Sequence, residues 1–587
     1  MVELLKSEIQ PLVEGALAQL GGDASLVVRM LQPAREADQG DLSLPCFPFA
    51  KTLGAAPATI AEQLKDKIGT HPAIGEVNAV NGYLNIRASP TWLASSLLNG
   101  AVRYGNTGSR REVLIEHTSA NPNGPFHVGR ARNAILGDTL VRLHRLWGDS
   151  VTAEYYVDDM GKQVAVLAWA LENMSAGDVE QLLSDREPAN PQWANKADHQ
   201  RVRWYQAAQL LRKESDESES IEKTIGELVH ASEHGDEAVL DAFQAAYQPV
   251  LDGMLETLGR LGIVFDRFTK ESVFVTNGDV ANLMERLGSL EINGVADNGA
   301  QFLDLGQRGL KGKTEFFYRR GDGSSLYATR DIAYHQWKWT QCNELINVLG
   351  EDHKLQAQQV GLTLEELGER RPEVMFYSFI KLPEGKMSTR RGNVVFMDDL
   401  LEEAQAHAVE VLKERRPDLD EASMTAIAEA VGTSAVRFNI ISVSPEKGFT
   451  FRWEDALSFE AGSAPFVMYS HTRACSIHRK VMEADASIGD SRTTPPIPET
   501  MPDGLVQLLR VLAVHDDRLA KVVREHRPNL YAEYMLQLST AYNSFYRDCY
   551  IIDEGNVNAF YYAISELART TLREGMEGLG IVPLETM

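Results

Sequence analysis

The feature that most constrains the fold is a strand, loop and helix followed by a second strand, between residues 112 and 161. The stretch EVLIEHTS has the alternation and β-branched residues of a strand, and the loop ANPNGPFHVG follows it. ARNAILGDTLVRLHRLWG then has apolar residues at helical spacing, and AEYYVDDMG resembles another strand. This βαβ pattern predicts an α/β fold built on a Rossmann-like, doubly wound parallel sheet, with ligands outside the carboxyl ends of its strands.

The rest of the chain predicts further modules, since 587 residues at about 150 per domain correspond to roughly four domains. Residues 1–106 contain an amphipathic helix at the start and the strand NGYLNIR, which indicates a small α+β domain. Residues 107–400 hold the sheet, and polar helices at about 164–320 indicate an insertion. Helical periodicity then predicts a connector at 401–444 and an all-α domain at 445–587.

Composition sets limits on the partners and on the compartment. The 58 basic and 83 acidic residues give a net charge of −25, so a nucleic-acid partner needs a local basic surface. The four cysteines, Cys46, Cys342, Cys475 and Cys549, form no C-x-x-C pair, which argues against a zinc ribbon and fits reduced thiols in the cytoplasm. No apolar run reaches the ~18 residues of a membrane span, so no membrane partner is expected.

Two short motifs could meet phosphate. His127, Val128, Gly129 and Arg130 stand where the first loop gives way to a helix, and helix N-termini favour anions. The second motif, Lys386-Met387-Ser388-Thr389-Arg390-Arg391-Gly392, is a basic loop suited to charge on a pyrophosphate leaving group. Each has an ordinary alternative, a loop histidine for the first and a solvated basic turn for the second. Neither decides the function alone.

Together the two motifs resemble the signatures of class I aminoacyl-tRNA synthetases, and more closely the arginyl-tRNA synthetase family. The matching segments follow that family's order: IEHTSANPNGPFHVGRARNAILGD, YYVDDMGKQ, LYATRDIAY, PEGKMSTRRGNVV, RWEDALSFEAGSAPFVMYSHTRACSI, AYNSFYRDC and LGIVPLETM. The resemblance covers nearly the whole chain. It implies an arginine-tRNA ligase that uses ATP with Mg²⁺, takes L-arginine and tRNA(Arg), is usually a monomer, and needs bound tRNA to activate arginine.

Two positions depart from the signatures. Arg130 stands where the first motif usually has a second His, and a guanidinium could still contact phosphate. Thr389 stands where the class has a second Lys, so Lys386 or the flanking Arg390 and Arg391 must supply the charge. These departures keep open a non-catalytic tRNA-binding paralogue, beside a different class I synthetase as the nearest rival enzyme.

Recognition of a guanidinium favours carboxylates in planar, charge-assisted hydrogen bonds. Tyr327 and Asp331 are spaced i, i+4 on a predicted helix, so both can point into one cavity. An ion pair of Asp331 with a nearby Arg and a core Tyr327 are the alternative. The resemblance implies that these two hold the arginine side chain and that Glu116, Ser119 and Asn121 also contact arginine.

The remaining site assignments come mostly from the resemblance. Gly350 and Asp352 end the strand INVLGED, where the sheet rule also expects a ligand, and Asp352 could accept from a ribose hydroxyl. The catalytic set is His127, Gly129, Arg130, Lys386, Met387, Ser388 and Arg390. The ATP-binding set is Asn123, Gly124, Pro125, His127, Gly129, Gly350, Asp352 and Lys386.

Two further segments match the family without a firm role from their own chemistry. Asp159, Gly161 and Gln163 match a segment that lines the family's pocket, although a strand-to-helix turn explains them as well. Tyr542, Asn543 and Tyr546 are expected to contact tRNA by family position. Their helical spacing is also that of a core stripe, in which most of the rings would be buried.

One pattern points to different chemistry. His230-Ala231-Ser232-Glu233-His234 spells H-x-x-E-H, the inverted zinc-protease pattern. It follows an acidic run and has no identifiable third ligand, so a solvated helix face is favoured over a zinc peptidase. No protein-bound metal is therefore expected.

Overall fold

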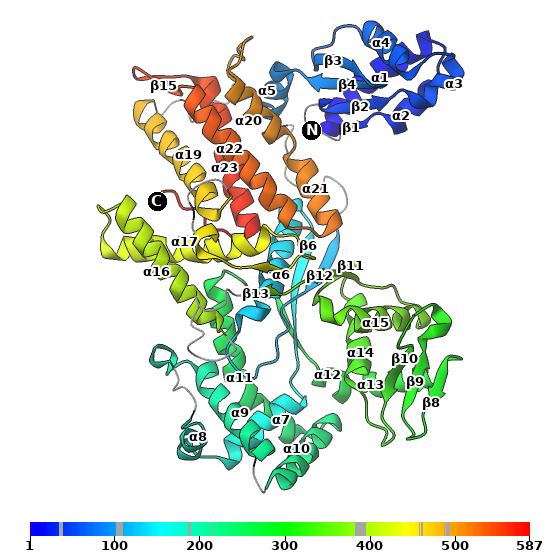
Figure 1. Ribbon diagram of the computed structural model, residues 1–587, viewed down its shortest axis with the longest axis vertical. Helices are drawn as coiled ribbons and strands as arrows, with labels where there is room; N and C mark the ends of the chain where they lie inside the picture. Colours follow the sequence, from blue (N-terminus) through cyan, green and yellow to red (C-terminus); the bar gives the residue numbers. More distant parts are fainter. Residues whose placement is uncertain are drawn as a thin grey trace.

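The computed structural model describes residues 1–34, 39–100, 110–185, 190–214, 217–381, 395–456, 458, 462–485, 488 and 494–587. At its centre is a five-stranded sheet in the order β12-β11-β5-β6-β7, with every pair parallel (Figure 1). The strands are β5 (Glu112–Glu116), β6 (Ser150–Val157), β7 (Arg267–Lys270), β11 (Glu344–Gly350) and β12 (Glu373–Tyr377). This is the doubly wound α/β architecture that the sequence predicts.

Helix α6 (Val128–Trp147) connects β5 to β6 and packs on the sheet. Its apolar residues Leu136 and Leu140 are buried against Ile115 of β5 and Ile346 of β11. Each buried side chain of this size stabilises the fold by roughly 1.5–3 kcal/mol. The helix ends at Gly148, whose φ of 100° lies in the left-handed region that glycine adopts without strain. The start of α6 is thereby held at the carboxyl ends of the strands.

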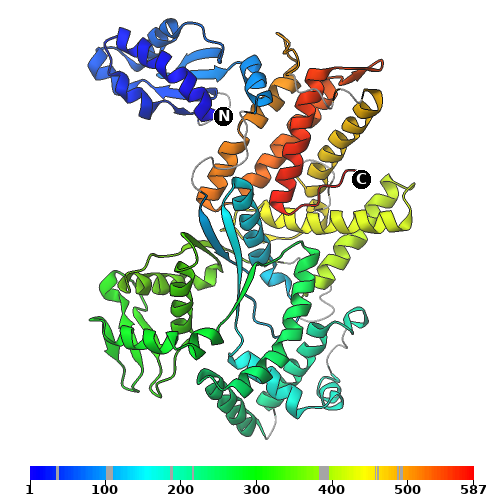
Figure 2. The same cartoon turned by 180° about the vertical axis from the view of Figure 1, so that it is seen from behind.

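The predicted insertion contains two lobes, which Figure 2 shows on either side below the sheet. The helical lobe consists of α7 (Lys162–Asn173), α8 (Ala176–Leu182), α9 (Ala197–Glu214), α10 (Ser218–Glu233) and α11 (Glu237–Arg260). The second lobe consists of α12 (Ser272–Thr276), α13 (Asp279–Gly288), β8 (Asn293–Val295), β9 (Gln301–Asp304) and β10 (Glu315–Arg319). Strand β7 lies between the lobes and belongs to the central sheet. The predicted insertion at about 164–320 therefore includes one strand of the central sheet.

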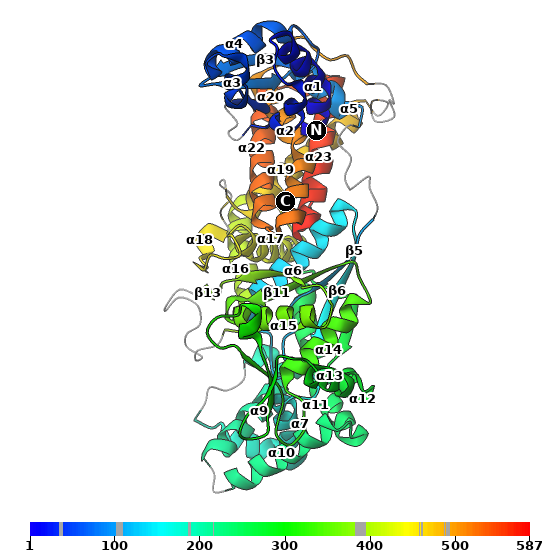
Figure 3. The same ribbon diagram turned by 90° about the vertical axis from the view of Figure 1, so that its right-hand side faces the viewer.

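The N-terminal domain is a small α+β unit with an antiparallel sheet in the order β1-β2-β4-β3. Its elements are α1 (Val2–Gln19), α2 (Val27–Met30), β1 (Gln32–Pro33), β2 (Leu42–Pro45), α3 (Ala50–Leu53), α4 (Pro57–Ile68), β3 (Ile74–Val80), β4 (Tyr83–Ala88) and α5 (Pro90–Leu98). Figure 3 shows this domain at one end of an elongated molecule, with α9 and α10 toward the other.

Helices α14 (Tyr327–Trp339) and α15 (Lys354–Glu366) precede and follow β11 in the chain and lie beside the sheet. After β12, helices dominate the described residues, as the periodicity predicts: α16 (Met397–Arg415), α17 (Glu421–Ile441), α18 (Trp453–Ala456), α19 (Ala464–Ala484), α20 (Asp503–Ala513), α21 (His515–Glu525), α22 (Asn529–Asp548) and α23 (Ala559–Leu579). Short strands pair as β13 (Ile380–Lys381) with β14 (Phe449–Thr450), and β15 (Ile552–Asp553) with β16 (Asn556–Val557). Within the described ranges, every helix is too short or too polar to cross a bilayer.

A buried arginine joins three of these modules. The side chain of Arg437 on α17 is 1% exposed, and its guanidinium donates to Asp138 Oδ2 of α6 at 2.6 Å. It also donates to the carbonyl oxygens of Leu261, just after α11, at 2.8 Å and of Leu579, at the end of α23, at 3.2 Å. The sheet domain, the helical lobe and the C-terminal helices therefore meet at one side chain.

Replacing this side chain, in Arg437→Met, should lower the free energy of unfolding by about 3 kcal/mol, because it leaves the buried Asp138 carboxylate with Arg142 as its remaining ion-pair partner. Chemical denaturation measures this change. Arg524→Met, at a side chain that is 72% exposed, is the matched control and should change stability little. Equal losses in the two variants would contradict the role given to Arg437.

Candidate functional site

A cavity of about 690 Å³ opens at the carboxyl edge of the central sheet. Its walls come from the ends of β5, β6, β11 and β12, from the start of α6, and from α14 and α15. Most of the predicted site residues that the structure describes line it: Glu116, Ser119, Asn121, His127, Gly129, Arg130, Tyr327, Asp331, Gly350 and Asp352. The position matches the sheet rule for ligand sites.

The loop after β5 has a strained backbone that directs polar groups into the cavity. Thr118 and Ser119 have φ values of 69° and 38°, in the left-handed region that costs non-glycine residues energy. Hydrogen bonds hold them there: the Thr118 amide donates to Asn133 Oδ1 at 2.7 Å, and Ser119 Oγ donates to Glu116 Oε1 at 3.1 Å. The predicted residues Glu116 and Ser119 are thus fixed to each other.

Tyr327 and Asp331 occupy the first turns of α14 and both line the cavity, as the i, i+4 spacing predicts. Asp331 pairs with His335 at 3.1 Å, and not with an arginine as the alternative interpretation had it. Burial alone would raise the pKa of Asp331, but the electrostatic interaction and hydrogen bond with His335, followed by the charge of Lys338, bring the pKa below its usual value. The cavity therefore presents a charged carboxylate.

The first motif lies at the start of α6. His127 precedes the helix with an extended backbone, and a Cβ on Gly129 would lie 2.9 Å from His127 Nδ1. Glycine therefore leaves room for the imidazole. Burial and the nearby Arg130 guanidinium lower the pKa of His127 to about 4, so the ring is neutral at physiological pH. It can act on a phosphate as a hydrogen-bond donor but not as a cation.

Three residues of the predicted ATP set do not line this cavity in the described part of the chain. Gly124 and Pro125 are buried, and a Cβ on Gly124 would meet Val202 of α9 at 2.6 Å. Asn123 instead donates from Nδ2 to Gln163 Oε1 at 2.9 Å. In this structure Asn123 and Gly124 pack against the helical lobe, and the assignment of all three residues to ATP stays a prediction.

The predicted residues Lys386, Met387, Ser388 and Arg390 lie outside the described residues. The chain that follows them returns to the first motif. The Val128 amide donates to the Val395 carbonyl oxygen at 3.0 Å, and the Met397 amide donates to that of Phe126 at 2.7 Å. The segment after the second motif is thus anchored beside His127.

Sequence reasoning missed several residues of the site. Asp158 lines the cavity, whereas the predicted Asp159 is buried and accepts from Ser272 Oγ at 2.6 Å. Both adjacent carboxylates follow the end of β6, and strand alternation from Tyr156, which lines the cavity, could have distinguished them. His335, Asn347 and Gln356 also line the cavity and were not singled out.

The tRNA prediction needs correction at one residue. Tyr542 is fully buried, and its hydroxyl group is hydrogen-bonded to Ser565 Oγ at 3.0 Å, so its ring cannot stack on a base. Tyr546 is 39% exposed, and the Arg473 guanidinium lies 4.7 Å from its ring centroid and 4.8 Å from that of Tyr469. Asn543 accepts a hydrogen bond from Arg473. These residues form an exposed aromatic and cationic patch on α19 and α22.

The H-x-x-E-H pattern is part of α10 and its end. The two imidazole rings stack with centroids 4.1 Å apart, and His234 Nδ1 is hydrogen-bonded to the His230 carbonyl oxygen at 2.7 Å. Glu233 pairs with Arg320 at 3.2 Å and with Arg330 at 3.3 Å. A helix end with local partners therefore explains the pattern.

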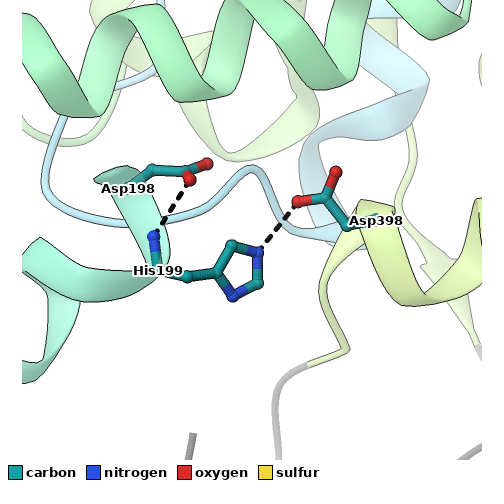
Figure 4. Close-up of side chains that lie close together, drawn as sticks. All are labelled: Asp198, His199 and Asp398. Atoms are coloured by element: carbon teal, nitrogen blue, oxygen red, sulfur yellow. Dashed lines mark hydrogen bonds and ion pairs between the residues drawn. The ribbon is translucent and has the colours of Figure 1, made fainter. Parts of the chain in front are cut away.

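Another group with metal-ligand chemistry is Asp198, His199 and Asp398, which are close together and buried (Figure 4). The Lys196 ammonium lies 3.0 Å from Asp198 Oδ2 and 2.8 Å from Asp398 Oδ2. A cation of the chain itself thus stands where a metal ion would bind. The cluster fastens the helical lobe to the start of α16 and has no free place for a metal.

Comparisons with known proteins agree with this geometry. Residues 93–453 match the family of the class I tRNA synthetase (R) catalytic domain. Residues 467–587 match the DALR anticodon binding domain, and residues 7–88 match the arginyl tRNA synthetase N terminal domain. Fold and site together therefore define a class I synthetase.

Whole-chain relatives specify the family. The arginine–tRNA ligase of Methanocella arvoryzae is 39% identical, with 99% of each chain covered, and that of Archaeoglobus fulgidus is 38% identical, with 94% of this chain and 96% of the relative covered. The chain belongs to the arginyl-tRNA synthetase family.

Solved structures show the same fold. The arginyl-tRNA synthetase of Thermus thermophilus superposes with a TM-score of 0.78 at 24% identity, covering 99% of this chain and all of the other. That of Plasmodium falciparum superposes with a TM-score of 0.76 at 15% identity, covering 99% of both chains. The arrangement of domains is therefore retained at low sequence identity.

Proposed function

We propose that the protein is an arginine–tRNA ligase, which activates L-arginine with ATP and transfers it to the 3′ end of tRNA(Arg). The family and the full-length relatives support this activity. The single observation that carries it is the cavity that combines His127 of the first motif with Asp331, a charged carboxylate suited to a guanidinium. ATP use follows from the class I catalytic domain.

In the first step, a carboxylate oxygen of arginine attacks the α-phosphorus of ATP, the bond to the bridging oxygen breaks, and pyrophosphate leaves. In the second step, a ribose hydroxyl of the terminal tRNA adenosine attacks the arginyl carbonyl, and AMP leaves. No covalent bond to the protein forms in either step. The protein contributes positioning and charge stabilisation, each worth about 3 kcal/mol or more in such reactions.

Arginine recognition is assigned to one wall of the cavity. Asp331 and Tyr327 bind the guanidinium, because both project from the start of α14 and the Asp331 carboxylate is charged. Glu116, Ser119 and Asn121, at the end of β5 and in its loop, bind the rest of the amino acid. A shorter or neutral amino acid would leave the buried carboxylate without its partner, which disfavours it.

The nucleotide is assigned to the opposite end of the cavity. His127 donates a hydrogen bond to phosphate, Gly129 allows close approach, and Arg130 supplies a fixed positive charge. Gly350 and Asp352, at the end of β11, face the ribose. Lys386, Met387, Ser388 and Arg390 complete the phosphate site, with Arg390 or Lys386 in place of the cation missing at Thr389. Mg²⁺ arrives with the nucleotide phosphates.

Each domain of the chain is assigned a role in tRNA binding or catalysis. Residues 1–106 and 445–587 bind tRNA, residues 107–400 with the two-lobed insertion at about 164–320 form the catalytic domain, and 401–444 connect them. Arginine activation requires bound tRNA, and the enzyme acts as a cytoplasmic monomer. Because the chain carries a charge of −25, tRNA affinity depends on local Lys and Arg residues and should fall steeply with salt.

The deciding experiment is aminoacylation of total tRNA with each of the twenty labelled amino acids, with ATP and Mg²⁺ present. Charging by arginine alone is expected. ATP–pyrophosphate exchange with arginine, with and without tRNA, then tests the tRNA requirement. Charging by another amino acid, or none by protein that binds tRNA, would overturn the proposal.

The exposed patch on α19 and α22 gives a further prediction. Tyr546→Ala should raise the KM for tRNA about tenfold, since loss of one base stack costs roughly 1–3 kcal/mol. Tyr542→Phe should leave that KM unchanged and cost about 1 kcal/mol of stability, because it removes only the buried bond to Ser565. Steady-state charging and thermal unfolding measure the two effects. A larger effect on tRNA from Tyr542→Phe would refute this division.

A further inference from the structure

Beneath the cavity lies a lysine that does not line it. The Lys338 side chain on α14 is 0% exposed. Its ammonium lies 2.6 Å from Glu116 Oε2, 3.1 Å from Asn347 Oδ1 and 3.2 Å from His335 Nε2. An ammonium has three N–H groups, and here three acceptor atoms lie within hydrogen-bond distance of it. All three acceptor residues line the cavity.

The strand register explains why these groups meet. Asn347 of β11 pairs directly with Glu116 of β5 in the parallel sheet. Lys338 and His335 are one turn apart on α14, which packs beside these strands. The ring of Tyr334 covers the ammonium, with its centroid 4.2 Å from Nζ. Water is thus kept from the charge, which strengthens its interaction with the Glu116 carboxylate.

The same contacts fix the proton of His335. Nε2 faces two donors, the Lys338 ammonium and Asn347 Nδ2 at 2.7 Å, so it must be an acceptor. Asn347 cannot be turned over, because its NH₂ group would then face the ammonium. The imidazole proton is therefore on Nδ1, which lies 3.1 Å from Asp331 Oδ1 and 2.8 Å from the Asp331 carbonyl oxygen.

We propose that Lys338 is a positioning residue of the arginine site, holding Glu116 directly and Asp331 through the Nδ1–H tautomer of His335. The inference rests on the proposed function, in which these two carboxylates bind arginine. A single buried cation then sets the orientation of both ends of the amino-acid site. Second-layer partners of this kind orient the groups that touch the ligand.

A double-mutant cycle tests the direct contact of Lys338 with Glu116. Lys338→Met, Glu116→Gln and the double variant are compared by steady-state charging. We expect Lys338→Met to raise the KM for arginine about tenfold or more, as loss of an orienting partner commonly does, with the KM for ATP unchanged. Its effect should shrink in the Glu116→Gln background, since the two residues act as a unit. Effects that multiply, or an equal rise in the KM for ATP, would overturn the proposal.

A separate measurement tests whether Lys338 acts on Asp331 through the tautomer of His335. In protein labelled with ¹⁵N-histidine, the ring signals of His335 are assigned by their loss in His335→Asn. They should show an Nδ1–H tautomer in the wild type and a changed pattern in Lys338→Met. A tautomer that is unchanged in Lys338→Met would refute the role of Lys338 in orienting Asp331.

Two controls distinguish the positioning role of Lys338 from a loss of folding and from a failure of the proposed function. Lys223→Met makes the same replacement at a side chain that is 79% exposed and should leave arginine KM unchanged. If Lys338→Met fails to fold because Glu116 is left unpaired, the double variant removes both charges and is compared with Glu116→Gln by the same ¹⁵N readout. A wild-type protein that does not charge arginine would refute the proposed function, while the tautomer measurement would still test the role of Lys338.

Discussion

Asp331→Asn should raise the KM for arginine about a thousandfold, because losing one partner of a buried, hydrogen-bonded charge pair costs roughly 2–5 kcal/mol. The Asp331 side chain is 18% exposed and lies at the cavity wall, so solvent reaches only a small part of it. Asparagine has the same size and leaves the packing of α14 intact. Steady-state charging with varied arginine measures the change, with the KM for ATP as an internal reference.

Asp241→Asn is the matched control, since Asp241 is exposed on α11, a helix whose residues do not line the cavity. It should leave both constants unchanged.

The pKa of Asp331 is held below its usual 3.8, so this carboxylate stays charged as the pH falls from 8 to about 5. Arginine affinity measured by calorimetry should therefore be flat between about pH 5 and 8 and weaken only below about pH 4. Parallel losses in the control, or an affinity that already declines near pH 6, would count against this assignment.

The second large effect is expected at His127. His127→Ala should lower kcat for tRNA-dependent ATP–pyrophosphate exchange by roughly a hundred- to a thousandfold, as removal of one transition-state donor does in other enzymes. The KM for arginine should stay the same, because the imidazole lies at the start of α6 and not beside α14. His127→Asn keeps a donor and should recover part of the loss.

The pH dependence gives an independent check on the role of this imidazole. With a pKa of about 4, His127 has already lost its proton at pH 6, so kcat/KM for ATP should show no inflection from this group between about pH 6 and 8. An inflection there that disappears in His127→Ala would show that the imidazolium acts instead. His234→Ala, at an exposed ring of the H-x-x-E-H pattern, is the control and should behave as wild type.

The sequence predicts the fold well where a local pattern, such as alternation or helical periodicity, also determines the place of the element in the sheet. The alternation in β5 and the periodicity of α6 fix a strand and a helix, and a parallel sheet then places His127, Asp331 and Gly350 at one edge. Strand β7 was not predicted, because it has only four residues, RFTK, and pairs only with β6 at the edge of the sheet. Such a segment is too short to show a period.

Burial was the property that the sequence could not supply. Tyr542 and Tyr546 are one turn apart on α22, yet Tyr542 is enclosed and Tyr546 is exposed. Their spacing is the same in either case, and only the packing of α23, which carries Ser565, distinguishes them. Lys338 is similar: a lysine in the last turn of a helix has the pattern of a solvated cation near the C-terminus, not of a buried one.

The Arg437 junction has a consequence for how the molecule can move. Three modules share one guanidinium, so any rotation between them that keeps its hydrogen bonds must pivot there. Displacement then grows with distance from the pivot. Fluorophore pairs attached to the β15–β16 hairpin and to α10, toward opposite ends of the molecule (Figure 1), would report such a rotation, whereas a pair on α17 and α6 would stay at constant separation.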